Sequence, residues 1–339
     1  MAAKLNELCL QEIFELVSVD KIDDHHRQNL FNCALVNRHW CINAIPILWR
    51  NPFPFSSHSG PAFISTLIND QQGSPFIYYR LIKQLNLQLL AEAIQDYLLL
   101  SFPTRQDNQS LNIVTSSILK LLCHKLVNTT ENVFFELNYH SVENLPMGDW
   151  NIYQIPDADT SLRKLRKLSI SNVKKSKEIL ESASRVSPNL SNLKIDCSCF
   201  LEENPFEYEE LFQLISYIKL FNNLRSLNIH VSIENNGDKI LSELGKNLPK
   251  TLETLCIEGY FEFSQESLEK FFHGAKGIKF QSLGFPESEE ISDKHLETIW
   301  KAIYDSSLDI SIKKLDVRYG NFVTRNQAKK FQDQGINVE

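Results

Sequence analysis

Long apolar runs are missing from this chain of 339 residues. No stretch reaches the roughly 18 residues that a membrane-spanning helix needs, so no transmembrane segment and no membrane partner are expected. The opening MAAKLNELC also lacks the apolar core and the cleavage site of a signal peptide. The seven cysteines are odd in number and irregularly spaced, which is typical of free thiols in a reducing compartment. We therefore expect a cytoplasmic or nuclear protein.

An excess of basic residues is missing too. The chain has 35 Lys and Arg residues against 42 Asp and Glu, with a net charge of -7 and a pI near 5.8. Because nucleic-acid binders usually present a basic surface to the phosphates, general nucleic-acid binding is not expected. Apolar residues make up 42% of the chain and charged residues 23%, which is typical of a folded globular protein with two or three domains at this length.

Motifs that carry catalysis or bind cofactors are also absent. The sequence contains no H-E-x-x-H, G-x-S-x-G, G-x-x-x-x-G-K or G-x-G-x-x-G pattern. Cys197 and Cys199 lack the four paired ligands of a structural zinc site. No nucleophile with a partnered base can be recognised. We expect no enzymatic activity, no metal and no cofactor.

What the chain does have is an apolar N-terminal segment, residues 5–50, in which three groups of apolar residues recur at helical spacing. The groups are Leu8, Ile13, Phe14, Leu16 and Val17; Leu30, Phe31, Ala34, Leu35 and Val36; and Trp40, Ile42, Ile45, Ile47, Leu48 and Trp49. Pro46 predicts that the third helix kinks or ends near Ala44 or Ile45. Because a module of this size buries only about 60% of its unfolded surface, the surplus apolar residues predict a docking face for a partner protein.

The order of residues in this segment resembles an F-box, in a variant common among fungal F-box proteins. The resemblance rests on Leu8, Glu12-Ile13-Phe14, an acidic loop with Asp20, Asp23 and Asp24, Leu30, L-V-N-R-x-W at residues 35–40 and I-P-x-L-W at residues 45–49. It implies docking onto an Skp-type adaptor, which links the motif to a cullin ubiquitin ligase. The residues that we assign to adaptor binding are Leu8, Cys9, Ile13, Phe14, Leu30, Val36 and Trp40, some of which must instead pack the core of the three helices.

One position departs from the family pattern. The family usually has Leu-Pro at the start of the first helix, and this chain has Leu8-Cys9. Because proline would preset the helix-starting dihedral, Cys9 predicts weaker helix initiation and leaves the strength of adaptor binding open. In the alternative interpretation, the three helices merely cap a larger domain.

After a turn-rich linker at residues 51–61, the chain returns to one pattern, apolar-x-x-Leu-x-apolar. The copies begin at Ile82, Phe134, Leu165, Leu190, Leu224, Leu252, Phe280 and Ile312, and the last six start 25, 34, 28, 28 and 32 residues apart. Amphipathic stretches between them are predicted helices: residues 173–186, 206–221, 238–248, 265–272 and 293–303. A strand and a helix alternating at this period resemble a leucine-rich repeat of the helix-containing kind.

The two resemblances imply an α/β fold in three parts. Residues 1–50 are the three-helix F-box, residues 51–75 a linker and first helix, and residues 76–339 a leucine-rich-repeat-like solenoid with a curved parallel sheet inside and helices outside. Residues 324–334, followed by Gly335, are predicted to form a capping helix and a last short strand.

The repeats also predict which strand residues face the concave surface. The first, fourth and sixth positions should point into the core, so the third, fifth and seventh should be polar. They are polar in every copy, beginning with Gln84, Asn86 and Gln88, except at Cys256, Gly284 and Pro286. A doubly wound sheet would be apolar on both faces. We predict that this surface binds a target protein through Lys167, Ser169, Lys194, Asn228, His230, Glu258, Lys314, Asp316 and Arg318.

Charged residues gather in three clusters. The basic cluster is Arg163, Lys164, Arg166, Lys167, Lys174, Lys175 and Lys177, and the acidic ones are Glu202, Glu203, Glu207, Glu209 and Glu210, and Glu287, Glu289, Glu290 and Asp293. Such runs are usually solvated faces. In the alternative interpretation, the basic cluster receives an acidic or phosphorylated segment of the target.

These features predict a substrate-recognition subunit of an Skp-cullin-F-box ubiquitin ligase whose target is unknown. The alternative is a leucine-rich-repeat interaction scaffold without a role in ubiquitin transfer.

Overall fold

The computed structural model describes most of the chain, in segments. These are residues 6–18, 24–52, 59–69, 77–102, 108–127, 136–140, 151–156, 158–171, 176–197, 207–231, 237–259, 262–286, 288, 291–318 and 323–338. The chain forms two compact units. The first is Met1–Asn138, Val142–Met147 and Gln154–Leu162, and the second is Tyr139–Ser141, Gly148–Tyr153 and Arg163–Glu339. The domain boundaries expected at residues 50 and 75 both lie inside the first unit.

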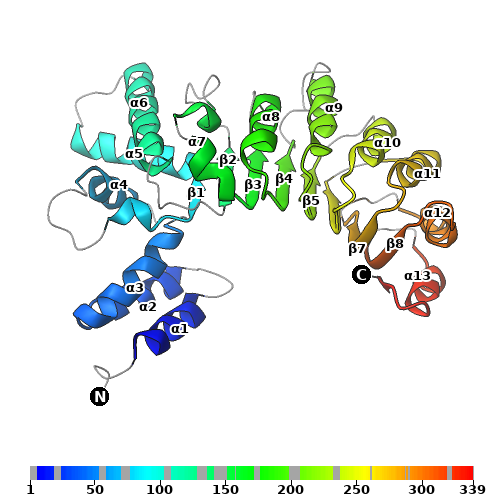
Figure 1. Ribbon diagram of the computed structural model, residues 1–339, viewed down its shortest axis with the longest axis horizontal. Helices are drawn as coiled ribbons and strands as arrows, with labels where there is room; N and C mark the ends of the chain where they lie inside the picture. Colours follow the sequence, from blue (N-terminus) through cyan, green and yellow to red (C-terminus); the bar gives the residue numbers. More distant parts are fainter. Residues whose placement is uncertain are drawn as a thin grey trace. The chain divides into compact units, whose positions relative to one another are not determined.

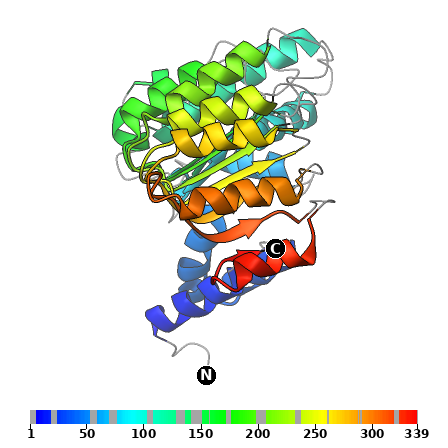
Figure 2. The same cartoon turned by 90° about the vertical axis from the view of Figure 1, so that its right-hand side faces the viewer.

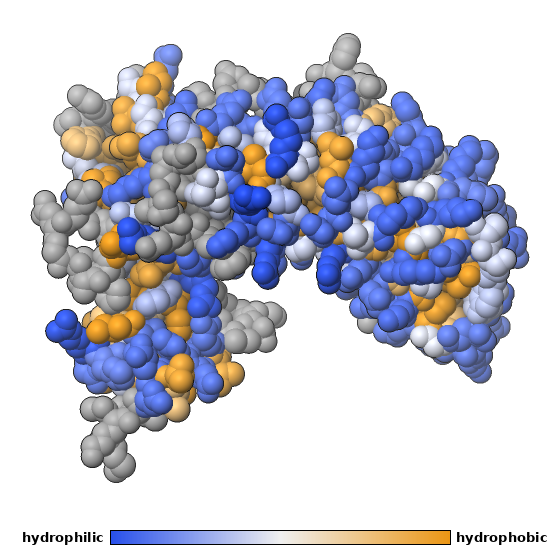
Figure 3. All heavy atoms as spheres, in the orientation of Figure 1, coloured by the Kyte–Doolittle hydropathy of each residue, from blue (hydrophilic) through white to orange (hydrophobic). Residues whose placement is uncertain are grey.

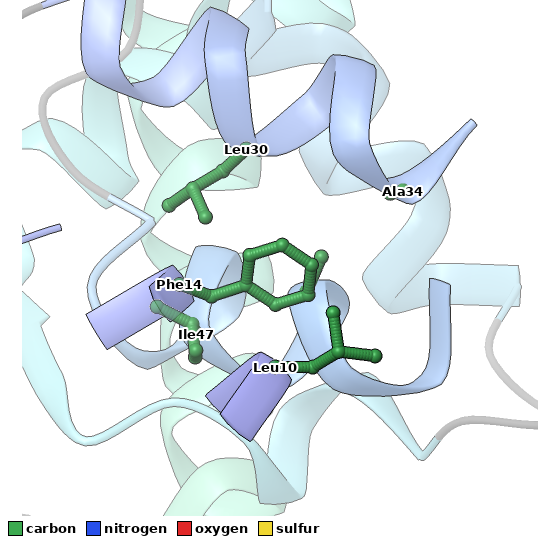
Figure 4. Close-up of a cluster of buried hydrophobic side chains, with 6 residues drawn as sticks. Leu10, Phe14, Leu30, Ala34 and Ile47 are labelled. Carbon is green, nitrogen blue, oxygen red and sulfur yellow. The ribbon is translucent and has the colours of Figure 1, made fainter. Parts of the chain in front are cut away.

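The first unit begins with three short helices, as predicted: α1 (Glu7–Ser18), α2 (Asp24–Ala34) and α3 (Arg38–Arg50). Asn37 caps α3, because its side chain accepts a hydrogen bond from the Trp40 backbone N–H at 2.9 Å. Figure 4 shows the side chains that these helices bury against one another. The buried residues are Leu10, Phe14, Leu30, Ala34, Ala44 and Ile47.

The expectation that α3 kinks or ends near Ala44 or Ile45 is wrong about the end, since the helix continues through Pro46 to Arg50. Packing on both sides of the proline offsets its cost of about 3 kcal/mol. Ala44 and Ile47 are buried in the three-helix core. Beyond the proline, the Trp49 ring stacks on the Phe63 ring, with the two ring centroids 5.1 Å apart. The centroid of the Tyr78 ring lies 4.4 Å from that of Trp49.

The rest of the first unit contains α4 (Ser59–Asn69), the short helix η2 (Tyr78–Arg80), β1 (Gln84–Asn86), α5 (Leu87–Ser101), α6 (Asn108–Val127), most of β2 (Glu136–His140) and α7 (Ala158–Ser161). β1 and β2 pair in parallel, with Gln84 opposite Glu136. The prediction that Gln88 faces the strand surface is wrong, because α5 starts at Leu87. Asn86 causes the early start: its side chain accepts the Leu89 N–H at 3.0 Å and so caps the helix.

The second unit is built from strand-helix repeats, which confirms the predicted α/β solenoid of a parallel sheet and helices. Its strands are β3 (Lys167–Ser171), β4 (Asn192–Asp196), β5 (Ser226–His230), β6 (Thr254–Glu258), β7 (Lys279–Gly284), β8 (Ser311–Asp316) and β9 (Asn337–Val338). Each pairs in parallel with the next along the chain. Two short helices precede β3, η4 (Ile152–Gln154) and η5 (Leu162–Lys164).

The helices of this unit cover one side of the strands (Figure 1) and stack side by side in nearly the same direction (Figure 2). They are α8 (Ser176–Val186), α9 (Glu207–Ile218), α10 (Gly237–Asn247), α11 (Gln265–Gly274), α12 (Asp293–Tyr304) and α13 (Arg325–Gln332). From the copy at Leu165 onward, the first-, fourth- and sixth-position residues are all buried. The predicted repeat register is therefore confirmed in this unit.

The end of the solenoid is closed as predicted, by α13, a glycine and the two-residue strand β9. Thr324 caps α13 by accepting the Gln327 N–H, and Gly335 turns the chain with φ +77°. Phe331 is fully buried, and its ring meets Trp300 edge-on at 5.2 Å. This cap covers apolar surface that the last repeat would otherwise expose.

Two glycines bring α10 and α11 unusually close together. A Cβ atom added at Gly245 would lie 2.4 Å from the Phe271 carbonyl oxygen, and one at Gly274 would lie 2.6 Å from the Gly245 carbonyl carbon. Both clashes are with backbone, so no side-chain rotation relieves them.

We therefore predict that Gly245→Ala lowers the free energy of unfolding of the second unit by about 1–3 kcal/mol, because the helices α10 and α11 must move apart to make room for the methyl group. In a solvent-exposed helix the same change would stabilise the protein by about 1 kcal/mol. A loss of stability would therefore indicate that Gly245 contacts α11. Melting followed by circular dichroism measures the effect. The control is Lys246→Ala on the same helix, where the side chain is exposed. A raised melting temperature for Gly245→Ala would show that the helices are not in contact there.

Candidate functional site

Large apolar side chains are exposed on the three N-terminal helices and on the turn between α2 and α3, and we call them the N-terminal apolar set. Its members and their exposed fractions are Leu8 66%, Ile13 42%, Leu16 74%, Phe31 49%, Leu35 68%, Val36 54% and Ile42 43%. Figure 3 shows apolar residues among polar ones on the surface of this region. On α1, Leu8 and Leu16 point away from Leu10 and Phe14, as their helical spacing requires. Both sides of α1 are therefore apolar, and only one packs within the chain.

The structure divides the residues that we assigned to adaptor binding. Leu8, Cys9, Ile13 and Val36 are exposed. Phe14 and Leu30 are buried in the three-helix core (Figure 4), so they hold the helices together and are not available to a partner. Trp40 is half-buried, with its ring edge-on to Phe14 at 5.5 Å.

Other exposed residues of the set were not among the predicted contacts. Leu16, Phe31 and Ile42 have the right helical spacing but fall outside the motif letters of the resemblance, whereas Leu35 lies inside the L-V-N-R-x-W motif and was not assigned to adaptor binding. The signal that would have found them is the solvent side of each helix, which becomes defined only once the buried side is known. Asp20 and Asp23 of the predicted acidic loop lie outside the described residues.

Cys9 lies within the first turn of α1, and the helix begins without help from proline. The side chain of Asn6 accepts a hydrogen bond from the Leu8 N–H at 3.3 Å, and the Asn6 carbonyl accepts the Leu10 N–H. Glu7 adds a negative charge at the N-terminal end of the helix, where the helix dipole favours it. The first turn is therefore stabilised by Asn6 and Glu7, which precede the departure from the family pattern at Cys9.

The second candidate surface is the side of β3–β8 opposite the helices, which we call the polar strand face. Because the strands pair in register, equivalent positions form rows across the sheet. One row is Lys167, Asn192, Ser226, Thr254, Ser282 and Lys314; the next is Ser169, Lys194, Asn228, Cys256, Gly284 and Asp316; a shorter one is Ser171, Asp196, His230 and Glu258. Every predicted target-binding residue lies in these rows except Arg318, which follows β8.

Three carboxylates of this face are bonded to neighbouring side chains. An Asp196 oxygen lies 3.5 Å from Nδ1 of His230. Glu258 accepts a hydrogen bond from Nδ2 of Asn228 at 2.8 Å, and the Cys256 sulfur lies 3.7 Å from the same oxygen. Asp316 accepts from Nε of Arg318 at 2.9 Å. These contacts fix the carboxylates in place before any partner binds.

The predicted target-binding residues differ in how far they are available. Lys167, Lys194 and Arg318 are exposed, and most of the others are half-buried. Asp316 is only 8% exposed, so it positions Arg318 more than it contacts a partner. Gly284 has no side chain, and its neighbours in the row pack closely over it, since an added Cβ would lie 3.3 Å from Cβ of Asp316 and 3.4 Å from Sγ of Cys256.

The charged clusters are only partly described. Arg163, Lys164, Arg166, Lys167 and Lys177 are exposed. Lys174, Lys175, Glu202, Glu203, Glu287, Glu289 and Glu290 lie outside the described residues, and the side chains of Glu207, Glu209 and Glu210 are not described. Within the described segments, no three His, Cys, Asp or Glu side chains are grouped as metal ligands. No helix in these segments is long and apolar enough to span a membrane.

Cys256 is the one thiol on the polar strand face. Burial raises the pKa of this thiol to about 12, with a further contribution from the negative charge of Glu258. At pH 8 the reactive thiolate is then a fraction on the order of 10⁻⁴. The side chain is therefore a neutral, weakly polar part of the surface.

We predict that iodoacetamide at pH 8 alkylates Cys256 much more slowly than the exposed Cys9, as followed by peptide mass spectrometry. Glu258→Gln should speed the reaction of Cys256 because it removes a nearby negative charge, while burial keeps that rate below the rate of Cys9. Equal rates at both cysteines in the folded native chain would contradict the described burial.

Comparison with known proteins adds little. No family model matches the sequence, and no curated protein matches it. The matching solved structures include one described as "Crystal structure of Rad7 and Elc1 complex in yeast", with 14% sequence identity and a TM-score of 0.34, over 97% of this chain and 70% of that chain. A TM-score of this size is too low to support a conclusion about this chain.

Proposed function

We propose that this chain is a substrate-recognition subunit of an Skp-cullin-F-box ubiquitin ligase. In this proposal α1–α3 dock onto an Skp-type adaptor, which connects them to a cullin, and the polar strand face holds a target protein for ubiquitin transfer by other subunits. The observation that carries the proposal is the N-terminal apolar set, exposed on helices that already have a core of their own.

The energetics of α1–α3 favour a permanent protein partner. Burying one leucine-sized side chain contributes about 1.5–3 kcal/mol, so seven exposed ones represent a large unfavourable contact with water. Exposed apolar side chains that adjoin one another often mark a protein-interaction site, and we infer that those of the N-terminal apolar set do so. The Skp-type identity of the partner rests on the F-box resemblance of residues 5–50, and the cytoplasmic or nuclear location rests on the sequence.

The second unit suits the positioning role of such a subunit. Its strand face carries polar side chains, which need no permanent cover, in contrast to the N-terminal apolar set. The bonds among Asp196, His230, Asn228 and Glu258 keep this face ordered without a ligand. A preordered face loses less conformational entropy when a target binds.

A second function from another class is an interaction scaffold that binds partners through the repeats and recruits no ligase. Cys9, in place of the family proline, favours this alternative, although Asn6 and Glu7 stabilise the first turn of α1. Co-purification with an Skp-type adaptor distinguishes the two functions, because only the receptor requires it.

We predict that the native chain co-purifies with an Skp-type adaptor and that Leu8→Asp and Val36→Asp each weaken binding at least tenfold. Each change puts a charge where an apolar contact is buried, at a loss of roughly 2 kcal/mol or more. Both side chains are exposed, so the variants should fold. Trp40 is unsuitable for this test because its ring packs on Phe14.

The matched control is Leu100→Asp. Leu100 is 73% exposed on α5, in the same unit but outside the three helices. Its variant should bind the adaptor as the native chain does. If the native chain fails to bind, the receptor is rejected in favour of the scaffold; if Leu100→Asp weakens binding as strongly as Leu8→Asp, the docking site is not on α1–α3.

A further inference from the structure

Helix α6 of the first unit has two apolar sides, and only one of them is buried. The buried side packs inward through Leu119, Leu122 and Leu126. The other side, which we call the outer face of α6, consists of exposed residues three or four positions apart: Ser110, Ile113, Val114, Ser117, Lys120, Leu121 and His124. Its apolar members are 38–67% exposed. This face has the spacing of a surface that packs against another helix.

The outer face of α6 is arranged symmetrically about Ser117. Ile113 lies four residues before Ser117, and Leu121 lies four residues after it. If two copies of α6 cross in opposite directions at Ser117, Ile113 of each copy lies opposite Leu121 of the other. The Ser117 side chain is short, and its hydroxyl donates a hydrogen bond to the Ile113 carbonyl of its own helix at 2.9 Å. The two helices can therefore approach each other closely at the crossing point.

The helices α5 and α6 carry opposite charges. α6 contains no Asp or Glu, and Lys120, His124 and Lys125 all lie in its C-terminal half. α5 contains no Lys or Arg, and its two acidic residues, Glu92 and Asp96, are exposed. A surface that joins these two helices is therefore acidic on one helix and basic on the other.

The contact between α5 and α6 determines where these charges lie. Nε2 of Gln95 donates a hydrogen bond to Oδ1 of Asn112 at 3.2 Å, so the acidic part of α5 lies beside the N-terminal half of α6. In two copies that cross at Ser117, the C-terminal half of one α6 lies over the N-terminal half of the other. Lys120 of each copy therefore approaches Glu92 and Asp96 of the other copy, and this attraction forms twice.

We propose that this chain forms a symmetric dimer in which the α6 helices of two copies cross at Ser117. A second copy fits this surface better than an unrelated helix does, because both the apolar positions and the charges of α5 and α6 are complementary to themselves. The proposal uses these two helices alone. It depends neither on adaptor docking by α1–α3 nor on target binding by the polar strand face.

Sedimentation equilibrium of the full chain across the micromolar range tests the proposal. We expect twice the chain mass of 39.2 kDa at the upper end of the range. Leu121→Asp should raise the dissociation constant of the dimer about a hundredfold, because it puts a charge into an apolar contact at two places in one dimer. Leu121 is 67% exposed, so the variant should fold, which circular dichroism verifies.

The matched control is Leu220→Asp. Leu220 is 43% exposed and belongs to the second unit, so the same change there should leave the dissociation constant unaltered. A native chain that sediments as a single copy at every concentration would overturn the proposal. A dimer that Leu8→Asp dissociates and Leu121→Asp does not would overturn it as well, because the contact would then lie on the N-terminal apolar set.

Charge exchange tests whether the surface meets a second copy of itself. Lys120→Glu should weaken the dimer about tenfold, since an exposed ion pair contributes little singly and this one forms twice. Adding Glu92→Lys and Asp96→Lys to the same chain should restore the native dissociation constant. Failure of this exchange to restore it would contradict the predicted pairing between copies.

A cysteine at the crossing point tests the symmetry. Under mild oxidation Ser117→Cys should form a disulfide with the same residue of the second copy, because a residue on a twofold axis meets itself. Peptide mass spectrometry identifies this link. A cysteine at position 117 that pairs only with other cysteines of the chain would contradict the proposed crossing.

The dimer and the ligase function can be tested separately. Leu121→Asp should co-purify with an Skp-type adaptor as the native chain does, since α6 lies outside α1–α3. A native chain that dimerises through α6 but does not bind the adaptor contradicts the ligase function and leaves the dimer supported. A chain that binds the adaptor but never dimerises contradicts the dimer alone.

Discussion

The register of the parallel strands is the constraint on which the second unit depends. Each strand hydrogen-bonds to the next so that leucines at the fourth position, such as Leu193, Leu227 and Leu255, lie side by side. A shift by one residue would turn these leucines to solvent and bury Lys194 or Asn228. Because that exchange is so unfavourable, the same register that forms the core also determines which side chains share the polar strand face.

This part of the fold could be predicted well because two sets of positions in each repeat, one apolar and one polar, independently indicate the same strand. The first, fourth and sixth positions are apolar while the positions between them are polar, and only a strand buried on one face satisfies both. The network between strands could not be predicted. Whether Asp196 meets His230, or Glu258 meets Asn228, depends on side-chain geometry that a repeat pattern does not contain.

The first unit was harder to predict, for reasons that differ from place to place. The repeat pattern did not predict α5 and α6, because the copies at Ile82 and Phe134, between which these helices lie, are separated by far more residues than the later ones. The end of α3 was misplaced because contacts from Phe63 and Tyr78 outweigh the local effect of Pro46. Phe14 and Leu8 belong to one apolar group in the sequence, and only the packing of α1 against its neighbours separates the core residue from the exposed one.

The glycine contact between α10 and α11 has a consequence for the curvature of the solenoid. In a repeat protein, neighbouring helices are spaced further apart than neighbouring strands, so each repeat is wedge-shaped. Stacking such repeats curves the sheet, with the strands on the concave side. Strands are always about 4.8 Å apart, whereas packed helices are usually 8–10 Å apart. At Gly245 and Gly274 the helix backbones touch, so the wedge between the repeats of β5 and β6 is thinner than one with full side chains would be. We therefore expect a locally flatter sheet under His230 and Glu258, and a flatter strip of strands can lie against a broader, less convex part of a partner.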